Sequence, residues 1–303
     1  MSKETIEHDI VIIGSGPAGL QAALHAGRRK TSAAVLGKLK NSSLNRAHLE
    51  NYCCMDNQVL GHEMLAQGKQ QALRSGAVFY DEDVLDIGIE DKGHFSVLIE
   101  SEKILKAKAL ILSMGISRNR LNVPGEKEFL GKGVSYCVDC DGGFFKGQTV
   151  AVVGSESAAA SGAMTLLLIA EKVHLIYHEL QVSDSLKNQV EKSDIIKHPG
   201  RRVKAIEGKE SVERLIFENG ESMNVDGIFI ELGAKGALGL ASKLGVSLDP
   251  ENFKYIITNK KQETNIPGIY AAGDICGPPW QVAKAVGEGC IAGLEAAAYA
   301  KKH

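Results

Sequence analysis

Cys137 and Cys140 are the residues of this chain best suited to chemistry, because two thiols separated by two residues can act as a pair. Such a pair binds zinc, forms a structural disulfide or exchanges electrons with a neighbouring group. Zinc needs four ligands in a tetrahedral array, and the sequence offers no second C-x-x-C or C-x-x-H pair to complete one. A structural disulfide is disfavoured in a reducing cytosol. We therefore predict no metal site, and we favour redox chemistry if an electron-carrying group binds beside the pair.

A glycine-rich segment near the N-terminus predicts where such a group binds. It has the pattern G-x-G-x-x-G and consists of Gly14, Ser15, Gly16, Pro17, Ala18 and Gly19. It follows an apolar run and opens a helical stretch. In that context the first glycine permits a tight turn, the second lets backbone approach a pyrophosphate, and the third lets the helix pack on the strand. The ribose-binding acid expected about 20 residues further on is missing, because Gly37 stands near that position.

Alternating apolar runs and helical stretches must position these residues. Two β-α-β starts, one at the N-terminus and one about half-way along, predict parallel sheets. The expected strands are 9–13, 33–36, several within 83–113, 149–153, 173–176, 226–230 and 268–272, and the expected helices include 17–29 and 279–299. We expect an α/β fold of two Rossmann-like three-layer domains. Residues 1–116 and 247–303 form a discontinuous first domain, and residues 117–246 form an inserted domain that carries the cysteine pair.

Bulk composition narrows the class of protein further. A formal net charge of −2 over 303 residues favours neither nucleic acid nor an anionic membrane as a partner. No apolar run reaches the ~18 residues of a membrane helix, and the charged start from Met1 to His8 lacks the apolar centre of a secretory signal. Six cysteines are too sparse for a disulfide scaffold. We expect a cytoplasmic protein with one working dithiol.

Five further segments, in their order and spacing, make the chain resemble the low-molecular-weight thioredoxin reductase family of two-domain FAD enzymes over nearly its whole length. These segments are Glu50-Asn51-Tyr52, Ser113-Met114-Gly115, Val123-Pro124-Gly125-Glu126, Ala272-Gly273-Asp274, and Gln281 with the helix after it. Two segments depart from the family pattern: Cys53-Cys54 replaces the usual Pro-Gly, and Ser113-Met114 replaces the usual Ala-Thr.

The resemblance implies FAD as cofactor, a homodimer, and rotation of the inserted domain during turnover. It implies that FAD is bound by the first glycine-rich turn, residues 14–19, together with Asn51, Gly115, Gly273, Asp274, Trp280, Gln281 and Val282. In the family the aspartate at the position of Asp274 holds the ribityl chain.

The same resemblance implies roles for the cysteine pair. Cys140 would face the flavin and bond to it transiently, Cys137 would attack the disulfide of a thioredoxin-like protein, and Asp141 would act as the acid–base group for the outgoing thiolate. For the remaining cysteines at 53, 54, 276 and 290 we expect small buried residues, and a relay role is left open.

A second glycine-rich turn, residues 154–159, departs from the dinucleotide pattern. Its middle glycine is replaced by Glu156, whose Cβ blocks close approach of a pyrophosphate and whose charge repels it by up to about 4 kcal/mol. NADPH-dependent members of the family present an H-R-R-type cluster for the 2′-phosphate, where this chain has Tyr177-His178-Glu179. We therefore doubt that this domain binds NADPH.

The family contains a branch without nicotinamide motifs, whose members take electrons from reduced ferredoxin or a related donor, and some members hold an additional flavin. Trp280 stands where NADPH-using members commonly have arginine, and it could stack on a flavin or simply pack at the start of the last helix. The leading hypothesis is an FAD-dependent disulfide reductase driven by ferredoxin or a similar donor. Alternatives are an NADPH-dependent thioredoxin reductase with an atypical nucleotide site, an FAD dithiol oxidase, and a non-enzymatic flavin redox sensor. The number of flavins per chain is left open.

Overall fold

The computed structural model describes residues 3–53, 55, 58–90, 93–116, 120–233, 237–251 and 254–303. The chain forms two compact units. Unit 1 comprises Met1–Ser117 and Leu240–His303, and unit 2 comprises Arg118–Gly239. Both units contain a parallel sheet with helices, which confirms the predicted α/β class with Rossmann-like sheets.

Unit 1 is built on a mixed sheet in the order β5-β2-β1-β8-β7-β6, with β17 also paired to β8. The strands are β1 (Thr5–Ile13), β2 (Ala33–Leu36), β5 (Val78–Tyr80), β6 (Val84–Ile89), β7 (Phe95–Ile99), β8 (Ile104–Leu112) and β17 (Ile269–Ala271). Strands β5, β2, β1, β8 and β17 run parallel, whereas β6, β7 and β8 form an antiparallel meander. A small hairpin of β3 (His48–Leu49) and β4 (Val59–Leu60) lies outside this sheet. The carboxyl ends of β1 and β8 meet at one edge, which is where an α/β sheet binds its ligand.

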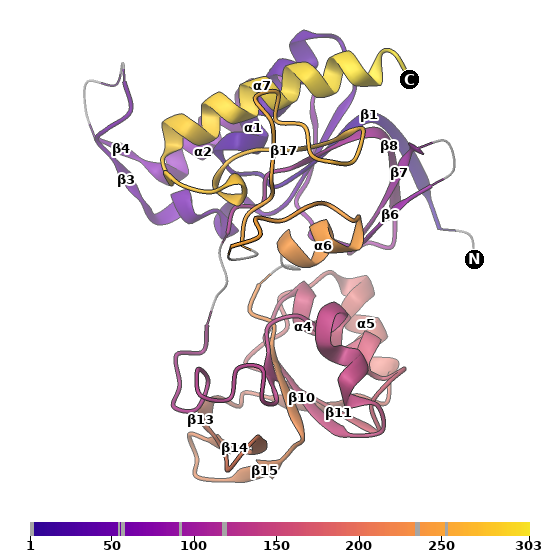
Figure 1. The fold of residues 1–303 in the computed structure, drawn as a ribbon, viewed down its shortest axis with the longest axis vertical. Coiled ribbons are helices and arrows are strands. Elements are labelled where there is room, and N and C mark those ends of the chain that lie inside the picture. Colours follow the sequence, from indigo (N-terminus) through magenta and orange to yellow (C-terminus); the bar gives the residue numbers. More distant parts are fainter. Residues whose placement is uncertain are drawn as a thin grey trace. The chain divides into compact units, whose positions relative to one another are not determined.

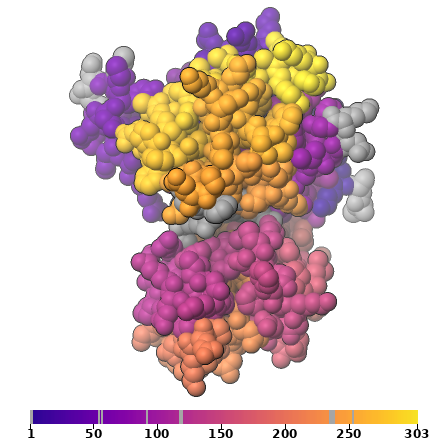
Figure 2. All heavy atoms as spheres, viewed as in Figure 1, coloured from indigo at the N-terminus to yellow at the C-terminus, as the bar shows by residue number. Residues whose placement is uncertain are grey.

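The long helices of unit 1 are α1 (Pro17–Arg28), α2 (Gly61–Arg74) and α7 (Val282–Ala300). Figure 1 shows α7, in yellow, lying along α1. Two glycines of α7 permit this close approach, because a Cβ at Gly289 would lie 2.2 Å from the Ala18 carbonyl oxygen and one at Gly293 would lie 2.4 Å from the Ala22 carbonyl oxygen. The alanine-rich core between these helices and the sheet holds the start of α1 against the start of α7. In Figure 2 the C-terminal residues, yellow and orange, form much of the face of unit 1 that is visible.

Unit 2 contains a parallel sheet in the order β12-β11-β10-β16-β9 and a three-stranded antiparallel sheet β13-β14-β15. The strands are β9 (Val134–Ser135), β10 (Thr149–Val153), β11 (Lys172–Tyr177), β12 (Ile196–Pro199), β13 (Val203–Gly208), β14 (Val212–Phe217), β15 (Ser222–Asn224) and β16 (Gly227–Ile230). The helices are α3 (Val138–Asp141), α4 (Ser157–Leu166) and α5 (Asp184–Lys192), and a 3-10 turn, η4 (Gly142–Phe145), follows α3. A buried apolar cluster joins the two sheets.

The boundary between the units differs from the sequence prediction at its C-terminal side. We expected residues 117–246 in the inserted domain, but residues 240–246 belong to unit 1. They include the end of α6 (Ala237–Lys243), where Lys243 forms an ion pair with Asp86 of β6. Leu240 and Leu244 of this segment are buried. Ser117, the first residue of the predicted inserted domain, lies outside the described residues.

Among the residues that the structure describes, no helix is both long enough and apolar enough to cross a membrane.

Candidate active site

Of the three glycines in the first glycine-rich turn, the middle one has open space where a side chain would stand. Gly14 has φ +117°, and a Cβ there would lie 2.3 Å from the Ser113 carbonyl oxygen. A Cβ at Gly19 would lie 1.8 Å from the Gly14 carbonyl oxygen. At Gly16, by contrast, the nearest protein atom to a Cβ is Ser42 Oγ at 3.5 Å. The fold itself therefore needs Gly14 and Gly19, whereas Gly16 leaves room for a ligand that approaches the backbone.

The start of α1 offers donors to that ligand. Helix α1 begins at Pro17, and its first turn carries no acidic side chain. Among the described residues, the N–H groups of Ala18 and Gly19 have no protein acceptor. Unpaired N–H groups at a helix N-terminus favour an anion such as a pyrophosphate. The turn therefore fits the phosphates of a dinucleotide.

Ser113 ties the end of β8 to this turn, a role that the sequence analysis missed. Its buried hydroxyl donates to the carbonyl oxygens of Ile13 at 3.0 Å and Gly14 at 3.1 Å. The serine that departs from the family pattern thus fastens two parallel strands at their carboxyl ends. Gly115 follows two residues later, and apart from its chain neighbours no atom of the described residues lies within 4 Å of a Cβ placed there. Ser15, also buried, lies against Gly37.

Two predicted site residues from opposite ends of the sequence meet in unit 1. Asn51 Nδ2 donates to Gln281 Oε1 at 2.8 Å. Gln281 is the N-cap of α7, and Val282, the first residue of that helix, packs on a small cluster with Leu44 and Leu49. Trp280 precedes them with 56% of its surface exposed. An amide pair at a helix N-terminus, with an exposed indole beside it, can hold a planar heterocycle.

Asp274 follows β17 and begins the 3-10 turn η5 (Asp274–Cys276). Gly273 before it has φ +90°, and a Cβ there would lie 3.0 Å from the Ala18 Cβ, so the aspartate is placed beside the first turn. Burial raises the pKa of Asp274, the charge of Lys284 lowers it, and the charge of Glu288 raises it. A half-buried carboxylate here can accept hydrogen bonds from the hydroxyls of a ligand.

Lys38 follows Gly37, which stands where a ribose-binding acid would be expected. Its ammonium group is paired with two carboxylates. Its Nζ lies 3.0 Å from Asp83 Oδ2 and 2.6 Å from Glu100 Oε1. Burial would lower the pKa of Lys38, but the hydrogen bond to Glu100 and the charge of Asp83 outweigh it and raise that pKa. Because both carboxylates are buried, this cluster stabilises unit 1 only while the lysine stays charged.

In unit 2, Cys137 and Cys140 form a disulfide with a Cα–Cα distance of 5.3 Å. Cys137 is the N-cap of α3 and its Sγ accepts from the Cys140 N–H at 3.2 Å. Cys140 is exposed and Cys137 is half-buried. The two thiols that the sequence singled out are thus close enough to exchange electrons as a pair.

Two polar residues that the sequence analysis did not select hold the disulfide turn. Ser135 Oγ donates to Asp141 Oδ2 at 2.6 Å and accepts from the Cys137 N–H at 3.0 Å. The buried carboxylate of Glu231 accepts from the Val138 N–H at 3.0 Å. Ser135 therefore orients the predicted acid–base group and the cysteine together. It could have been found only by knowing that β9 ends beside α3.

The Val123-Pro124-Gly125-Glu126 segment is connected to the same turn. Buried Glu126 accepts from the backbone of Leu121 and Asn122 and from the Tyr136 hydroxyl at 2.8 Å. Tyr136 directly precedes Cys137. Glu126 therefore holds the residue that directly precedes the disulfide turn.

Two exposed apolar side chains belong to the segments around the disulfide. Phe144, in η4, is 80% exposed, and Leu168, in the turn after α4, is 88% exposed. The two segments pack together: the Gly147 N–H donates to the Ile169 carbonyl oxygen at 3.0 Å. Large exposed apolar side chains on adjoining segments are a feature of protein-binding surfaces.

Several polar groups of the second glycine-rich turn are engaged by the protein itself. The Ala158 N–H donates to the Gly233 carbonyl oxygen at 3.2 Å. Ser155 Oγ accepts from the His178 N–H at 3.2 Å, and the Ser155 carbonyl oxygen accepts from the Gln181 N–H at 2.7 Å. Glu156 is the N-cap of α4, and Glu179 is exposed. In this turn the donor equivalent to Ala18 is already engaged by the protein.

The other cysteines differ in their surroundings. Cys53 is exposed, so our expectation of a small buried residue was wrong there, because its segment follows the β3 strand at the surface. Cys54 lies outside the described residues. Burial raises the pKa of the Cys276 thiol to about 12, which keeps it protonated at neutral pH.

Among the described residues, no group of three or more His, Cys, Asp or Glu side chains is arranged to hold a metal ion.

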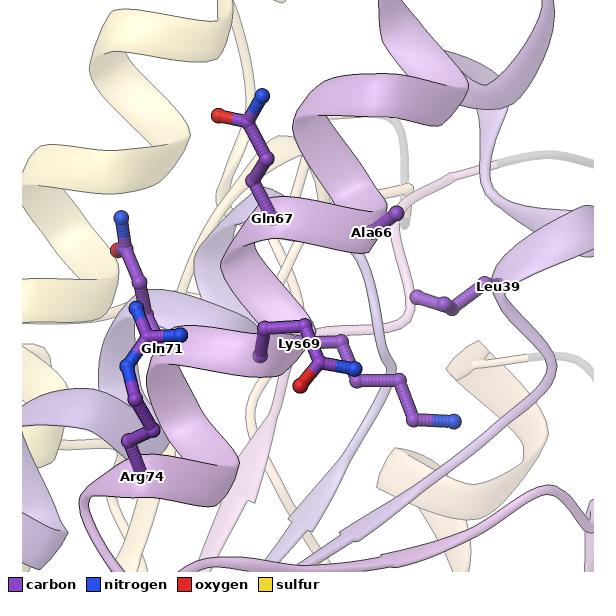
Figure 3. Close-up of a pocket in the computed structure, with 7 residues that line it drawn as sticks. Leu39, Ala66, Gln67, Lys69, Gln71 and Arg74 are labelled. Carbon is purple, nitrogen blue, oxygen red and sulfur yellow. The ribbon is translucent and has the colours of Figure 1, made fainter.

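A separate surface hollow of about 550 Å³ lies along α2 (Figure 3). It is lined by Leu39 and by Ala66, Gln67, Lys69, Gln70, Gln71 and Arg74. The predicted site residues lie on other elements.

Known proteins resemble this chain over nearly its full length. A model of the family described as pyridine nucleotide-disulphide oxidoreductase matches residues 8–289. The bifunctional thioredoxin reductase/thioredoxin of Mycobacterium leprae is 33% identical over 312 residues, covering 99% of this chain and 67% of that protein.

Two solved structures share the fold. An atypical thioredoxin reductase from Desulfovibrio vulgaris has a TM-score of 0.84 and 33% identity, covering 98% of this chain and 99% of that one. A ferredoxin-flavin thioredoxin reductase from Clostridium acetobutylicum has a TM-score of 0.70 and 31% identity, covering 99% of this chain and 100% of that one.

Proposed function

We propose that this chain, which belongs to the pyridine nucleotide-disulphide oxidoreductase family, reduces a thioredoxin-like protein disulfide with electrons from a donor other than NADPH. The chain is a thioredoxin reductase-like flavin disulfide oxidoreductase, and its family uses FAD. The donor, the protein substrate and the roles of individual residues are the proposed part.

The observation that carries the proposal is the difference between the two glycine-rich turns. The first turn has Gly16 open to a ligand and leaves the Ala18 N–H for it. The second has Glu156 at the equivalent position, and its Ala158 N–H is bonded to Gly233. One turn suits a dinucleotide pyrophosphate and the other opposes it both sterically and by charge. FAD would bind the first turn, with Asp274, Asn51 and Gln281 around it.

The disulfide supplies the chemistry toward the substrate. FAD, when bound, supplies two-electron storage. Reduction of the Cys137–Cys140 disulfide takes up two electrons and two protons. The Cys137 thiolate then attacks the substrate disulfide and forms a mixed disulfide, and Cys140 displaces the substrate as a dithiol. Asp141, held by Ser135 at 2.6 Å, donates the proton to the departing thiolate.

The resemblance to the Clostridium acetobutylicum protein supports ferredoxin as the class of donor, because that neighbour is described as a ferredoxin-flavin enzyme. A one-electron donor must transfer an electron twice for each disulfide that is reduced.

The exposed Trp280 beside Gln281 supports a second flavin stacked on the indole. Counting the flavins bound per chain tests this. We further propose that the chain acts as a homodimer in the cytoplasm, as the family resemblance implies.

A trapping experiment tests the substrate assignment. In Cys140→Ser the attacking thiol remains but the thiol that releases the substrate is gone, so we expect a stable mixed disulfide with thioredoxin. Cys137→Ser is the matched control and should trap nothing. Both variants are incubated with oxidised thioredoxin after reduction and are analysed by mass spectrometry. A mixed disulfide in Cys137→Ser alone, or in neither variant, contradicts the assigned roles.

A further inference from the structure

The backbone N–H and the backbone carbonyl of Gly273 both bond to side chains of α7. The Gly273 N–H donates to Glu288 Oε2 at 2.8 Å. The Gly273 carbonyl oxygen accepts from Lys284 Nζ at 2.9 Å. Lys284 Nζ also donates to the same Glu288 oxygen at 3.0 Å. The three groups close a ring of hydrogen bonds around a single glycine.

This ring is sheltered from solvent. The side chains of Lys284 and Glu288 are 16% and 18% exposed, and they are four residues apart on one face of α7. A second ion pair involving α7, between Lys261 and Glu295, has side chains that are 62% and 33% exposed. Hydrogen bonds to charged groups are stronger than neutral ones, and more so away from water. The sheltered pair is therefore suited to fixing a backbone position.

The backbone that this ring of hydrogen bonds holds, at Gly273, sets the position of Asp274. Gly273 adopts φ +90° beside Ala18 of the first glycine-rich turn, and Asp274 follows directly. The charges of Lys284 and Glu288 act on the Asp274 carboxyl with opposite signs. The pair can thus hold the aspartate's backbone without adding a large net charge next to it.

We propose that Lys284 and Glu288 form a clamp that positions Asp274 for the hydroxyl-bearing chain of FAD. They are positioning residues that act through Gly273 and touch neither substrate nor the reacting atoms. The inference rests on FAD binding at this turn and is independent of the donor and of the protein substrate.

FAD binding by the apoprotein tests the clamp. The flavin is removed, and FAD is titrated back with its fluorescence as readout, on the full chain and between pH 4 and 8. We expect Lys284→Met and Glu288→Gln each to weaken FAD binding about tenfold at pH 7.5, which corresponds to about 1.4 kcal/mol. Glu295→Gln, on the same helix but away from Gly273, is the matched control and should bind as the wild type does. Lys284→Arg keeps the charge and a donor and should retain most of the affinity.

The pH profile separates positioning from simple loss of structure. FAD affinity falls as Asp274 becomes protonated, so the midpoint of that fall follows the Asp274 pKa. Removing the positive charge of Lys284 should move the midpoint to higher pH, and removing the negative charge of Glu288 should move it to lower pH. Wild-type affinity in both variants, or midpoints that move in the same direction, would overturn the clamp. A wild-type apoprotein that bound no FAD would instead overturn the cofactor site and the clamp with it.

Discussion

The backbone N–H of Ala158 donates to the carbonyl oxygen of Gly233, 3.2 Å away, at the start of a helix where a dinucleotide-binding domain keeps its donors for a phosphate. Ala18, at the equivalent position of the first glycine-rich turn, has no protein acceptor among the described residues. Both units repeat one β-α-β pattern, yet the second turn has lost the open middle glycine and has its Ala158 amide engaged by the protein. Unit 2 retains the parallel sheet, and the disulfide follows its edge strand β9.

Placing the second turn's glutamate in the first turn should abolish flavin binding. Gly16→Glu adds a Cβ and a negative charge where the pyrophosphate approaches, and like charges at about 4 Å repel by up to about 4 kcal/mol, or nearly three powers of ten in affinity. Gly16→Ala adds the Cβ alone and should weaken binding less. The apoprotein should stay folded in both, because the nearest protein atom lies 3.5 Å from that Cβ. Calorimetry with FAD measures both effects.

Gly19→Ala serves as the contrast for this pair. Its Cβ would lie 1.8 Å from the Gly14 carbonyl oxygen, so we expect the apoprotein itself to melt at a lower temperature. If Gly16→Glu bound FAD as tightly as the wild type, the turn would not be the phosphate site.

Ser135 should matter for turnover, because its hydroxyl orients Asp141 at 2.6 Å. Loss of one hydrogen bond to a charged group is worth about 1.5 kcal/mol, so Ser135→Ala should slow reduction of a disulfide substrate about tenfold. Ser135→Thr keeps the hydroxyl and should recover most of the rate. Stopped-flow measurement of the pre-reduced enzyme with a small aromatic disulfide isolates this step.

The control for Ser135 is Ser193→Ala, which removes a hydroxyl bonded to Val190 in the same unit. Equal rates in Ser135→Ala, Ser193→Ala and the wild type would remove Ser135 from the account.

Lys38 should be a large contributor to the stability of unit 1. Lys38→Met removes the ammonium group that contacts both buried carboxylates, Asp83 and Glu100, and breaking a buried ion pair from one side typically costs about 3–5 kcal/mol. Lys103→Met, whose partner Glu4 is 61% exposed, should cost less than about 1 kcal/mol. Urea unfolding of each variant gives the comparison.

The pH dependence of the Lys38 contribution has a defined sign. The pKa of Lys38 is raised on folding, so its contribution is fully present below the unfolded value of 10.5 and is lost as pH rises through the folded pKa. The difference in unfolding free energy between wild type and Lys38→Met should therefore shrink above pH 10.5. A difference that stayed constant to higher pH would contradict this assignment.

Phe144 and Leu168 should contribute to recognition of a protein substrate and not to the chemistry. They are 80% and 88% exposed on segments that pack together next to the disulfide turn. Burying a large apolar side chain is worth about 1.5–3 kcal/mol, so replacing either with alanine should raise KM for thioredoxin roughly tenfold or more. Reduction of a small disulfide should be unchanged. Ile257→Ala, which removes an exposed apolar side chain from unit 1, is the control.

The sequence predicted the parts of the fold in which local pattern and tertiary packing agree. The β2 strand was predicted at its observed bounds, and helix α1 at residues 17–29 is observed at Pro17–Arg28. Helix α2 was missed, because among its fourteen residues only Gly61, Leu65 and Ala72 are buried and the apolar spacing is weak. The antiparallel strands β13 and β14 were missed because exposed charged residues interrupt their alternation, and β15 was missed because it is only three residues long.

At the site, the sequence selected residues by type and could not supply their partners. Cys137 and Cys140 are found by spacing alone. The bond between Asn51 and Gln281, the support of Asp141 by Ser135, and the Gly273 clamp each join residues from different elements. Such pairs depend on how strands and helices pack, and a single sequence carries no local signal for them. The engagement of Ala158 by Gly233 belongs to the same class.

The most direct test of the central claim is anaerobic titration of the purified protein with flavin absorbance as readout. NADPH and NADH are added first and photoreduced ferredoxin second, and the flavin is extracted and counted per chain. We predict no bleaching of the flavin by either nicotinamide and full bleaching by reduced ferredoxin. Rapid bleaching by micromolar NADPH would contradict the account, because it would show that Glu156 and the engaged Ala158 amide do not prevent a nicotinamide donor from reaching the flavin.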